Sequence, residues 1–332
     1  MIVARKEPLK MLFSQTQNNN NALALSETYN PLTAPTMSDY LKDFLAFRQT
    51  SLTTKKTYAK AIRVFITYLN EEGITAPTEE TLLAFRESLF NKSLEATTIA
   101  SYINAIKQLF SWLEEKGLYR NIARNIKGAK VNTQYHRKEA LTQEQAKSIL
   151  EHLKGDSLEA KRNYAILLLA LCCGLRTIEI IRANKEDITF KLGSKVLLIQ
   201  GKGKLDKADF VKLPAPVEEA IKDYLQERGE APASAPLFAS NSDRNHGKRL
   251  TTDSISRIIK NSFRAVGLDS KTLTAHSTRH TFITLFLMNG GTLEEARQIA
   301  RHSSINTTMI YNHALERAKN NGEAKVCSLL VG

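Results

Sequence analysis

Residues 276–311 read HSTRHTFITLFLMNGGTLEEARQIARHSSINTTMIY, and more can be inferred from this stretch than from any other part of the chain. Its first half has the apolar spacing of a helix, and spacings of three and four residues place His276, Arg279 and His280 on one face. The polar face of a surface helix explains these side chains without any function. Two histidines four residues apart can also bind a metal ion, but no carboxylate or cysteine stands beside them, so we expect no metal site.

The second half of the stretch contains Arg301 and His302 and ends at Tyr311, nine residues after the histidine. Taken alone, this tyrosine is more readily explained as a packed aromatic ring than as a reactive group. The pair of basic residues is equally compatible with a solvated turn. A function is indicated only if other residues of the chain complete the pattern.

Two further polar features lie upstream. Arg176 follows the apolar run Ala165–Cys173, which places an arginine at the edge of a hydrophobic core. A buried arginine needs a partner, and Glu179, one helical turn further on, is either that structural partner or a support for a guanidinium that binds phosphate. Lys202 stands at the tip of an expected hairpin, where a solvated lysine is the simpler interpretation.

The chain has 332 residues, which indicates two domains at about 100–200 residues each. A hydrophobic fraction of 42% and a charged fraction of 24% are typical of a globular protein. The run Ala165–Cys173 is the longest apolar one and is far shorter than the roughly 20 residues of a membrane span. Three cysteines are too few for a disulfide framework, so we expect a protein of the reducing cytoplasm.

The net charge of +13 favours a polyanionic partner, above all nucleic acid, because each neutralised phosphate releases counterions. A basic but otherwise ordinary enzyme is the alternative. The chain lacks the phosphate-binding motif G-x-x-x-x-G-K-[ST], the metalloprotease motif H-E-x-x-H and the hydrolase motif G-x-S-x-G. Nucleotide hydrolysis and serine-hydrolase chemistry are therefore not expected.

The first half of the chain predicts a disordered arm followed by a helical domain. Residues 1–37 are polar and aperiodic, and helical order begins near Ser38 as a possible N-cap. Residues 38–127 carry apolar stripes at helical spacing and no strand signal, which predicts a four-helix domain whose aromatic residues lie in the core. Gly73 and Gly117 end the two longest stripes, as left-handed helix caps do.

Residues 128–140 form a basic linker, and residues 141–332 form a second domain that ends in a tail helix. Thr142 and Gln145 make a capping box at its start. Strands are expected at 196–199 and 208–213, and helices around 143–153, 159–173, 216–228, 252–265, 278–289, 293–300 and beyond 312. The fold class is therefore mostly α, with a small antiparallel β-sheet in the C-terminal domain.

In this order and at these spacings, the polar residues resemble the signature of the tyrosine recombinase, or phage-type integrase, family. That signature is an arginine, a hairpin lysine, H-x-x-R, a histidine, and a tyrosine nine residues later. The resemblance covers roughly residues 38–315. In its order of domains the chain is similar to the two-domain Xer recombinases, which have a helical core-binding domain before the mixed α/β catalytic domain. One departure is Arg301, where the family more often has glycine; this change removes no catalytic group and either alters the packing or adds a phosphate contact. The matching residues are Arg176, Lys202, His276, Arg279, His302 and Tyr311.

The resemblance implies a site-specific recombinase that cleaves and rejoins duplex DNA through a 3′-phosphotyrosyl bond, without ATP, metal or other cofactor. It implies that Tyr311 is the nucleophile, Arg176 and Arg279 clamp the phosphate, and His276 is the base. It also implies that His302 donates a hydrogen bond to the phosphate and Lys202 protonates the leaving 5′-oxygen. Glu179 and His280 are expected to support the site structurally.

The implied partner is double-stranded DNA with inverted-repeat core sites. The resemblance implies that the chain is a monomer or weak oligomer when free and a homotetramer on DNA. Accessory DNA-bending or directionality proteins are possible further partners, and no membrane is involved. Two alternatives remain: a type IB topoisomerase-like enzyme, which shares the cleavage chemistry, and a catalytically idle DNA-binding protein with the same fold. The basic residues expected to contact DNA are Lys55, Lys56, Arg120, Arg124, Lys127, Lys130, Arg137, Lys204 and Arg301.

Overall fold

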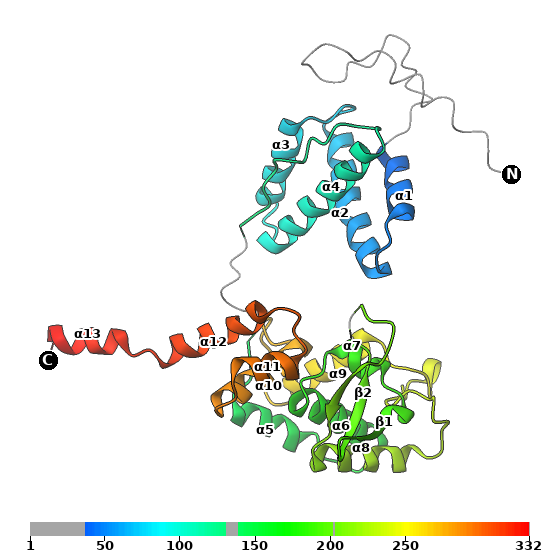
Figure 1. Cartoon of the computed structure of the whole chain (residues 1–332), viewed down its shortest axis with the longest axis vertical. Coiled ribbons are helices and arrows are strands. Elements are labelled where there is room, and N and C mark those ends of the chain that lie inside the picture. Colours follow the sequence, from blue (N-terminus) through cyan, green and yellow to red (C-terminus); the bar gives the residue numbers. More distant parts are fainter. Residues whose placement is uncertain (1–36, 131–138, 202, 332) are drawn as a thin grey trace, which may run out of the picture. The chain divides into compact units, whose positions relative to one another are not determined.

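The computed structural model describes residues 37–130, 139–201 and 203–331. The expected arm, apart from its last residue, lies outside these ranges, and so do Arg137 and the expected catalytic Lys202. The chain divides into two compact units between Val131 and Asn132 (Figure 1). Within the described ranges, no helix is both long and apolar enough to cross a membrane.

The N-terminal unit consists of helices whose apolar stripes meet in one core, as predicted. The edge of the Phe65 ring packs on Phe85 with 5.0 Å between ring centroids, and both side chains are buried. Gly73 and Gly117 have φ of +65° and +64°, which confirms the left-handed conformation expected at the helix ends. Helix α1 begins one residue before the expected N-cap Ser38. The helices are α1 (Met37–Phe47), α2 (Leu52–Glu71), α3 (Glu79–Asn91) and α4 (Ala96–Glu115).

The C-terminal unit combines helices with one small antiparallel sheet in the strand order β1-β2-β3. This confirms the predicted fold class. The capping box of Thr142 and Gln145 is present at the start of α5. The helices are α5 (Gln143–His152), α6 (Leu158–Cys172), α7 (Thr177–Arg182), α8 (Ala215–Arg228), α9 (Thr252–Ala265), α10 (Ala275–Met288), α11 (Leu293–Ala300), α12 (Ile305–Lys319) and α13 (Gly322–Val331), and the strands are β1 (Ile188–Lys191), β2 (Ser194–Ile199) and β3 (Asp209–Lys212).

Three elements differ from the expectation. Strand β1 was not predicted because its residues are only half-buried or exposed, so the strand carries no apolar run. It pairs with β2 through a two-residue turn at Leu192 and Gly193, whose φ values of 49° and 73° suit a tight hairpin. Helix α7 has too few residues to show a period. Helix α12 begins at Ile305 rather than beyond 312, so Tyr311 lies within it.

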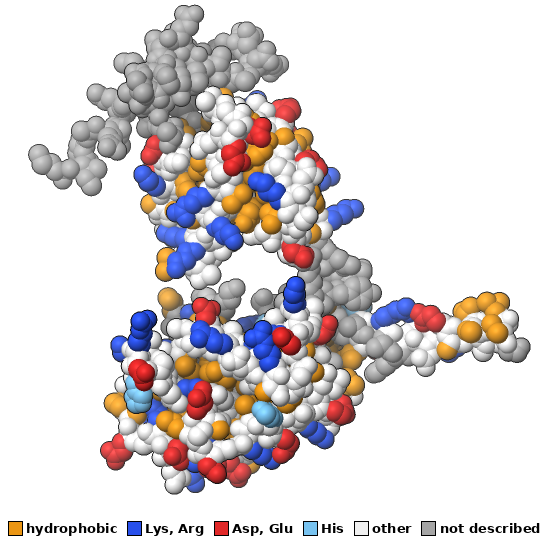
Figure 2. Space-filling model, turned by 180° about the vertical axis from the view of Figure 1, so that it is seen from behind, with side chains coloured by type: hydrophobic (Ala, Val, Ile, Leu, Met, Phe, Trp, Pro, Cys, Tyr) orange, Lys and Arg blue, Asp and Glu red, His pale blue; other side chains and the backbone are white. Residues whose placement is uncertain are grey.

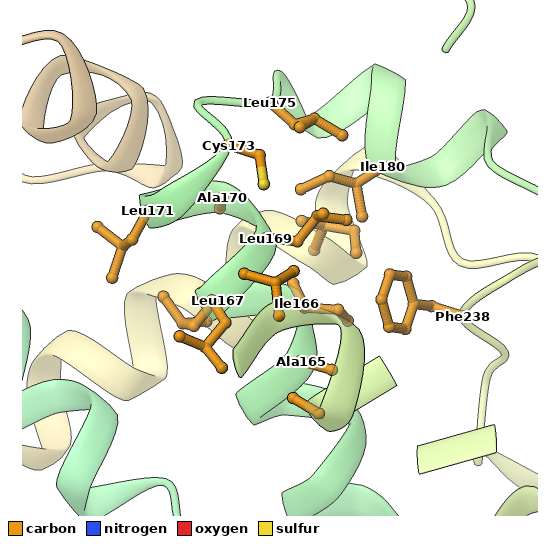
Figure 3. Close-up of a cluster of buried hydrophobic side chains, with 14 of the residues drawn as sticks. Ala165, Ile166, Leu167, Leu169, Ala170, Leu171, Cys173, Leu175, Ile180 and Phe238 are labelled. Atoms are coloured by element: carbon orange, nitrogen blue, oxygen red, sulfur yellow. The ribbon is translucent and has the colours of Figure 1, made fainter. Parts of the chain in front are cut away.

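Helix α6 forms the centre of the C-terminal unit and packs against α8 and α10. Its residues Ile166, Leu167 and Leu169 are fully buried, and Figure 3 shows them in the apolar cluster that also includes Phe238. The second half of α6 is apolar on every side, and such a segment belongs in the middle of a core. The end of α6 is therefore fixed, and it positions the turn that carries Arg176.

Candidate active site

Three segments of the C-terminal unit meet around Tyr311. They are the turn from α6 into α7, the first half of α10, and the turn from α11 into α12, and α10 packs against α6, α11 and α12. The signature residues described by the structure come from these segments. Tyr311, His302 and Arg279 are buried, whereas His276 is exposed.

Arg176 and Glu179 form the first part of the site. Arg176 caps the start of α7, and its backbone N–H donates to Glu179 Oε2 at 2.8 Å. Its Nη1 donates to Glu179 Oε1 at 2.9 Å, as the spacing of three residues allows. Burial raises the pKa of the fully buried Glu179 carboxyl, but Arg301, the Arg176 N–H, and the charges of Arg176 and Arg279 together hold this pKa below its ordinary value.

Arg279 is held in the core by backbone carbonyl groups. Its side chain is 1% exposed. Nη1 donates to the Gly174 carbonyl at 2.6 Å, and Nη2 donates to the Ala300 carbonyl. Burial and the charges of Arg176 and Arg301 lower the pKa of Arg279 to about 9, so it remains a cation at neutral pH. Two fixed acceptors leave this guanidinium little freedom to move.

The Tyr311 ring contacts two histidine rings. Its centroid is 5.2 Å from that of His280 and 6.4 Å from that of His302, which it faces at an interplanar angle of 17°. His302 Nδ1 shares a hydrogen bond of 2.9 Å with the buried Thr308 hydroxyl, which orients the ring. Burial raises the pKa of Tyr311 to about 12, although Arg279 and Arg176 act in the opposite direction. Of these residues, Thr308 was not predicted, because a threonine in a helix gives no signal of its own.

His276 and His280 contact each other edge to face, with 4.7 Å between ring centroids. His280 therefore touches both His276 and Tyr311. No cluster of three or more metal-ligating side chains occurs in the part of the chain that the structure describes. The geometry instead links the exposed His276 to the buried tyrosine through one intervening ring.

A pocket of about 690 Å³ opens beside Arg176 and His276. Its wall contains Lys260, Arg264 and Lys271 with one acid, Asp269, so cationic side chains predominate. Asp269 lies 3.1 Å from Lys260 Nζ and 3.1 Å from Arg264 Nε. A concave surface of this charge suits a phosphate group. The lysines and the arginine of α9 and the following loop were not predicted, because they have no motif spacing.

Most residues expected to contact DNA lie on the surface, and two of them form ion pairs with carboxylates of the protein. Lys204 Nζ lies 2.8 Å from Asp209 Oδ2, and Arg124 Nη2 lies 2.9 Å from both carboxylate oxygens of Glu114. These two cations are thus partly neutralised in the free protein. Lys56, Arg120, Arg124, Lys127 and Lys130 are exposed and Lys55 is half-buried.

Arg301, which was expected to contact DNA or to alter the packing, has its side chain inside the site. Its side chain is only 11% exposed, and its Nη2 donates to Glu179 Oε2 at 2.8 Å. The buried carboxylate attracts the guanidinium inward because a buried charge requires a partner. The structure therefore assigns Arg301 to the interior of the site rather than to the surface.

Comparisons with known proteins agree with this geometry. Residues 139–317 match the phage integrase family, and residues 37–117 match the phage integrase N-terminal SAM-like domain. A tyrosine recombinase of Synechocystis is 30% identical over 78% of this chain and 85% of its own length. The tyrosine recombinase XerC of Thermodesulfovibrio yellowstonii is 29% identical over 67% of this chain and 73% of its own.

Solved structures share the fold. The XerH recombinase in a post-cleavage complex with its difH substrate has a TM-score of 0.69 at 24% identity, over 87% of this chain and 86% of XerH. The Tn1549 transposon integrase bound to transposon-end DNA has a TM-score of 0.66 at 17% identity, over 86% of this chain and 99% of the integrase. With a family match over more than half of its length and a relative 30% identical over most of both chains, this chain belongs to the phage integrase family and is a tyrosine-type site-specific DNA recombinase.

Proposed function

We propose that Tyr311 attacks a phosphodiester of duplex DNA and forms a 3′-phosphotyrosyl bond, which is later reversed by a free 5′-hydroxyl. The observation that carries the proposal is the meeting of Tyr311 with Arg176, Arg279 and His302 from three separate segments. The new ester replaces the broken one, so the energy of the DNA bond is conserved. Rejoining therefore needs neither ATP nor a metal ion.

The two arginines supply the charge that the reaction requires. Negative charge accumulates on the non-bridging phosphate oxygens in the transition state, and fixed donors stabilise it most because they need no rearrangement. Arg279 is fixed by the carbonyl groups of Gly174 and Ala300. Arg176 is fixed by Glu179 and also lines the pocket, where it can bind two phosphate oxygens.

The nucleophile must lose its proton. A pKa of about 12 keeps Tyr311 neutral near pH 7, so a base is needed at the moment of attack. We assign that role to His276, which lines the pocket beside Arg176 and contacts the ring of His280. His302, oriented by Thr308, donates a hydrogen bond to the phosphate. Lys202, which lies outside the described residues, protonates the leaving 5′-oxygen.

The substrate in this proposal is duplex DNA with inverted-repeat core sites in the cytoplasm. XerH and the Tn1549 integrase are both described in complex with DNA. We propose that residues 38–127 act as the core-binding domain, that residues 128–140 act as the linker, and that residues 141–332 carry the catalysis. The chain, a monomer or weak oligomer when free, assembles as a homotetramer on DNA, with accessory DNA-bending or directionality proteins where the element requires them.

The decisive experiment captures the covalent intermediate. Purified protein is incubated with sheared DNA of the source organism and denatured, and the DNA that stays attached to protein is sequenced to identify the site. A nicked duplex of that site then traps the adduct on a denaturing gel. Tyr311→Phe is expected to bind this duplex but to give no adduct, and an adduct that persists in this variant refutes the assignment of the nucleophile.

A further inference from the structure

We propose that Arg301 is a positioning residue of this site, which holds Glu179 and thereby leaves the Arg176 guanidinium available to phosphate. The proposal rests on the proposed function and adds a third arginine to it. Resemblance to the family predicts glycine at this position, so the arginine is a feature of this chain. Neither its backbone nor its side chain fits a surface residue.

The backbone of Arg301 has an unfavourable conformation. It ends α11 with φ 53° and ψ 46°, the left-handed region in which glycine carries no steric penalty and other residues do. The cost of this conformation must be offset by interactions of the side chain. Arg301 Nη1 donates to the Ile299 carbonyl at 2.7 Å, and Nη2 reaches Glu179 at 2.8 Å.

The contact with Glu179 joins two of the three segments of the site, the turn from α11 into α12 and the turn from α6 into α7. Arg301 stands between Ala300, whose carbonyl accepts from Arg279, and His302, which faces Tyr311. Glu179 lies 122 positions away in the sequence and caps the turn that carries Arg176. The ion pair therefore fixes the turn between α11 and α12 against the start of α7.

The charges around Glu179 explain why a second guanidinium matters. A carboxylate bound by Arg176 alone would neutralise most of the charge of that arginine. Since Arg301 shares the carboxylate, one negative charge faces two guanidinium groups in direct contact, and Arg279 adds a third nearby. The site keeps an excess of positive charge, which a phosphate can satisfy.

Within the described residues, Arg301 Nε is buried and has no hydrogen-bond partner. A buried donor of this kind is rare and costs stability. Together with the left-handed backbone, it indicates that the side chain is kept inside by the Glu179 contact rather than by general packing.

The test compares variants that remove the charge in different ways. Arg301→Met removes the charge and keeps the left-handed backbone, whereas Arg301→Gly also relieves the backbone and thus remains testable if the Met variant does not fold. Arg301→Lys keeps the charge. Arg317→Met is the matched control, because it removes one charge from an exposed ion pair with Glu323 in the same unit.

Single-turnover cleavage of the nicked duplex, DNA affinity and melting temperature are measured for each protein. Loss of one charge-assisted contact is expected to slow cleavage about tenfold or more, with affinity changed less than about twofold. Arg301→Lys is expected to recover most of the rate, and Arg317→Met to match the wild type. A wild-type cleavage rate in folded Arg301→Met or Arg301→Gly overturns the proposal.

A double variant tests whether Arg301 acts through Glu179. In a Glu179→Gln background, Arg301→Met is expected to have little further effect on cleavage, because the carboxylate that it holds is gone. A full tenfold loss in that background overturns the positioning role. If the wild type itself forms no adduct, the proposed function fails; if it forms one and the Arg301 variants match it, only this inference fails.

Discussion

Gly174→Ala probes how tightly the site is built. Gly174 has φ of +59°, and a Cβ added there would lie 2.4 Å from Cδ1 of the Phe282 ring. The left-handed backbone costs about 1–2 kcal/mol for alanine, and displacing a packed ring costs about 1–3 kcal/mol. The free energy of unfolding is thus expected to fall by about 2–5 kcal/mol. At about 2–4 °C per kcal/mol, the melting temperature falls by roughly 4–20 °C.

Gly267→Ala is the matched control. Its φ of +79° carries the same backbone cost, but no atom lies within 4 Å of the added Cβ. We therefore expect a loss of only about 1–2 kcal/mol. In a Phe282→Leu background, Gly174→Ala is expected to lower the free energy of unfolding by less than it does in the wild type. The reason is that the ring edge that the methyl group meets is gone.

The same variant has a catalytic consequence. The Gly174 carbonyl accepts from Arg279 Nη1 at 2.6 Å, so a shift of this turn moves the guanidinium. Cleavage of the nicked duplex is expected to fall below that of Gly267→Ala at a temperature where both are folded. Equal stability losses in the two variants would refute the steric reasoning, and unchanged cleavage in folded Gly174→Ala would refute the positioning of Arg279 by this carbonyl.

Three further outcomes are expected. Affinity for duplex DNA, measured by fluorescence anisotropy, should fall steeply between about 50 and 200 mM salt because phosphate contacts release counterions; an unchanged affinity contradicts the charge reasoning. The pKa of Tyr311 is about 12 in the folded protein against an ordinary 10, so the unfolded chain loses this proton first and stability falls as pH rises from 10 to 12. Tyr311→Phe should lack this loss, which is about 3 kcal/mol, in urea unfolding. Parallel pH curves for the two proteins would refute this expectation. Deleting residues 322–332 should spare single-site cleavage and reduce synapsis. The reason is that α13 buries none of its residues and exposes the apolar side chains of Val326, Leu329, Leu330 and Val331 (Figure 2). A parallel loss of cleavage and melting temperature, without a selective synapsis defect, would instead indicate that the tail packs within its own protomer.

Much of the fold follows from local patterns. The stripes of α2 and α4 repeat over five turns, so their period predicts both helices and their buried faces. The strand β2 is an apolar run between turn residues and is equally visible. By contrast, β1 carries no apolar run and α7 is too short to show a period. Strand β1 pairs with β2, and α7 packs against α9, α6 and β2. Tertiary packing, rather than local preference, decides such elements.

The site divides in the same way. Taken singly, Arg176, Arg279 and Tyr311 favour a structural interpretation, and the resemblance to the signature of the tyrosine recombinase family singles them out. The groups that hold them are not visible in the sequence: a glycine carbonyl for Arg279, and Thr308 for His302. Any residue offers a carbonyl, so only the fold determines which one is used.

The partner that draws the Arg301 side chain inward could not be predicted from the sequence. A basic residue in a turn normally remains solvated, and nothing near it in the sequence indicates a buried partner. The partner, Glu179, is brought close only when α7 and the end of α11 meet. Once the carboxylate is buried, an arginine within reach is drawn to it.

The excess of positive charge in this site affects both the stability of the free protein and the binding of phosphate. Arg279 is almost fully buried and donates to two neutral carbonyl groups, whereas Arg176 and Arg301 share one buried carboxylate. Buried cations in excess of their counter-charges destabilise the folded protein. In the proposed mechanism, a DNA phosphate placed beside Arg176 would supply the missing negative charge, so binding would relieve a repulsion between the arginines of the free protein. The attraction between this positive charge and the phosphate would be strongest in the transition state, in which the phosphate is most negative. On the proposed mechanism, an arrangement of arginines that destabilises the free protein would therefore favour strand cleavage.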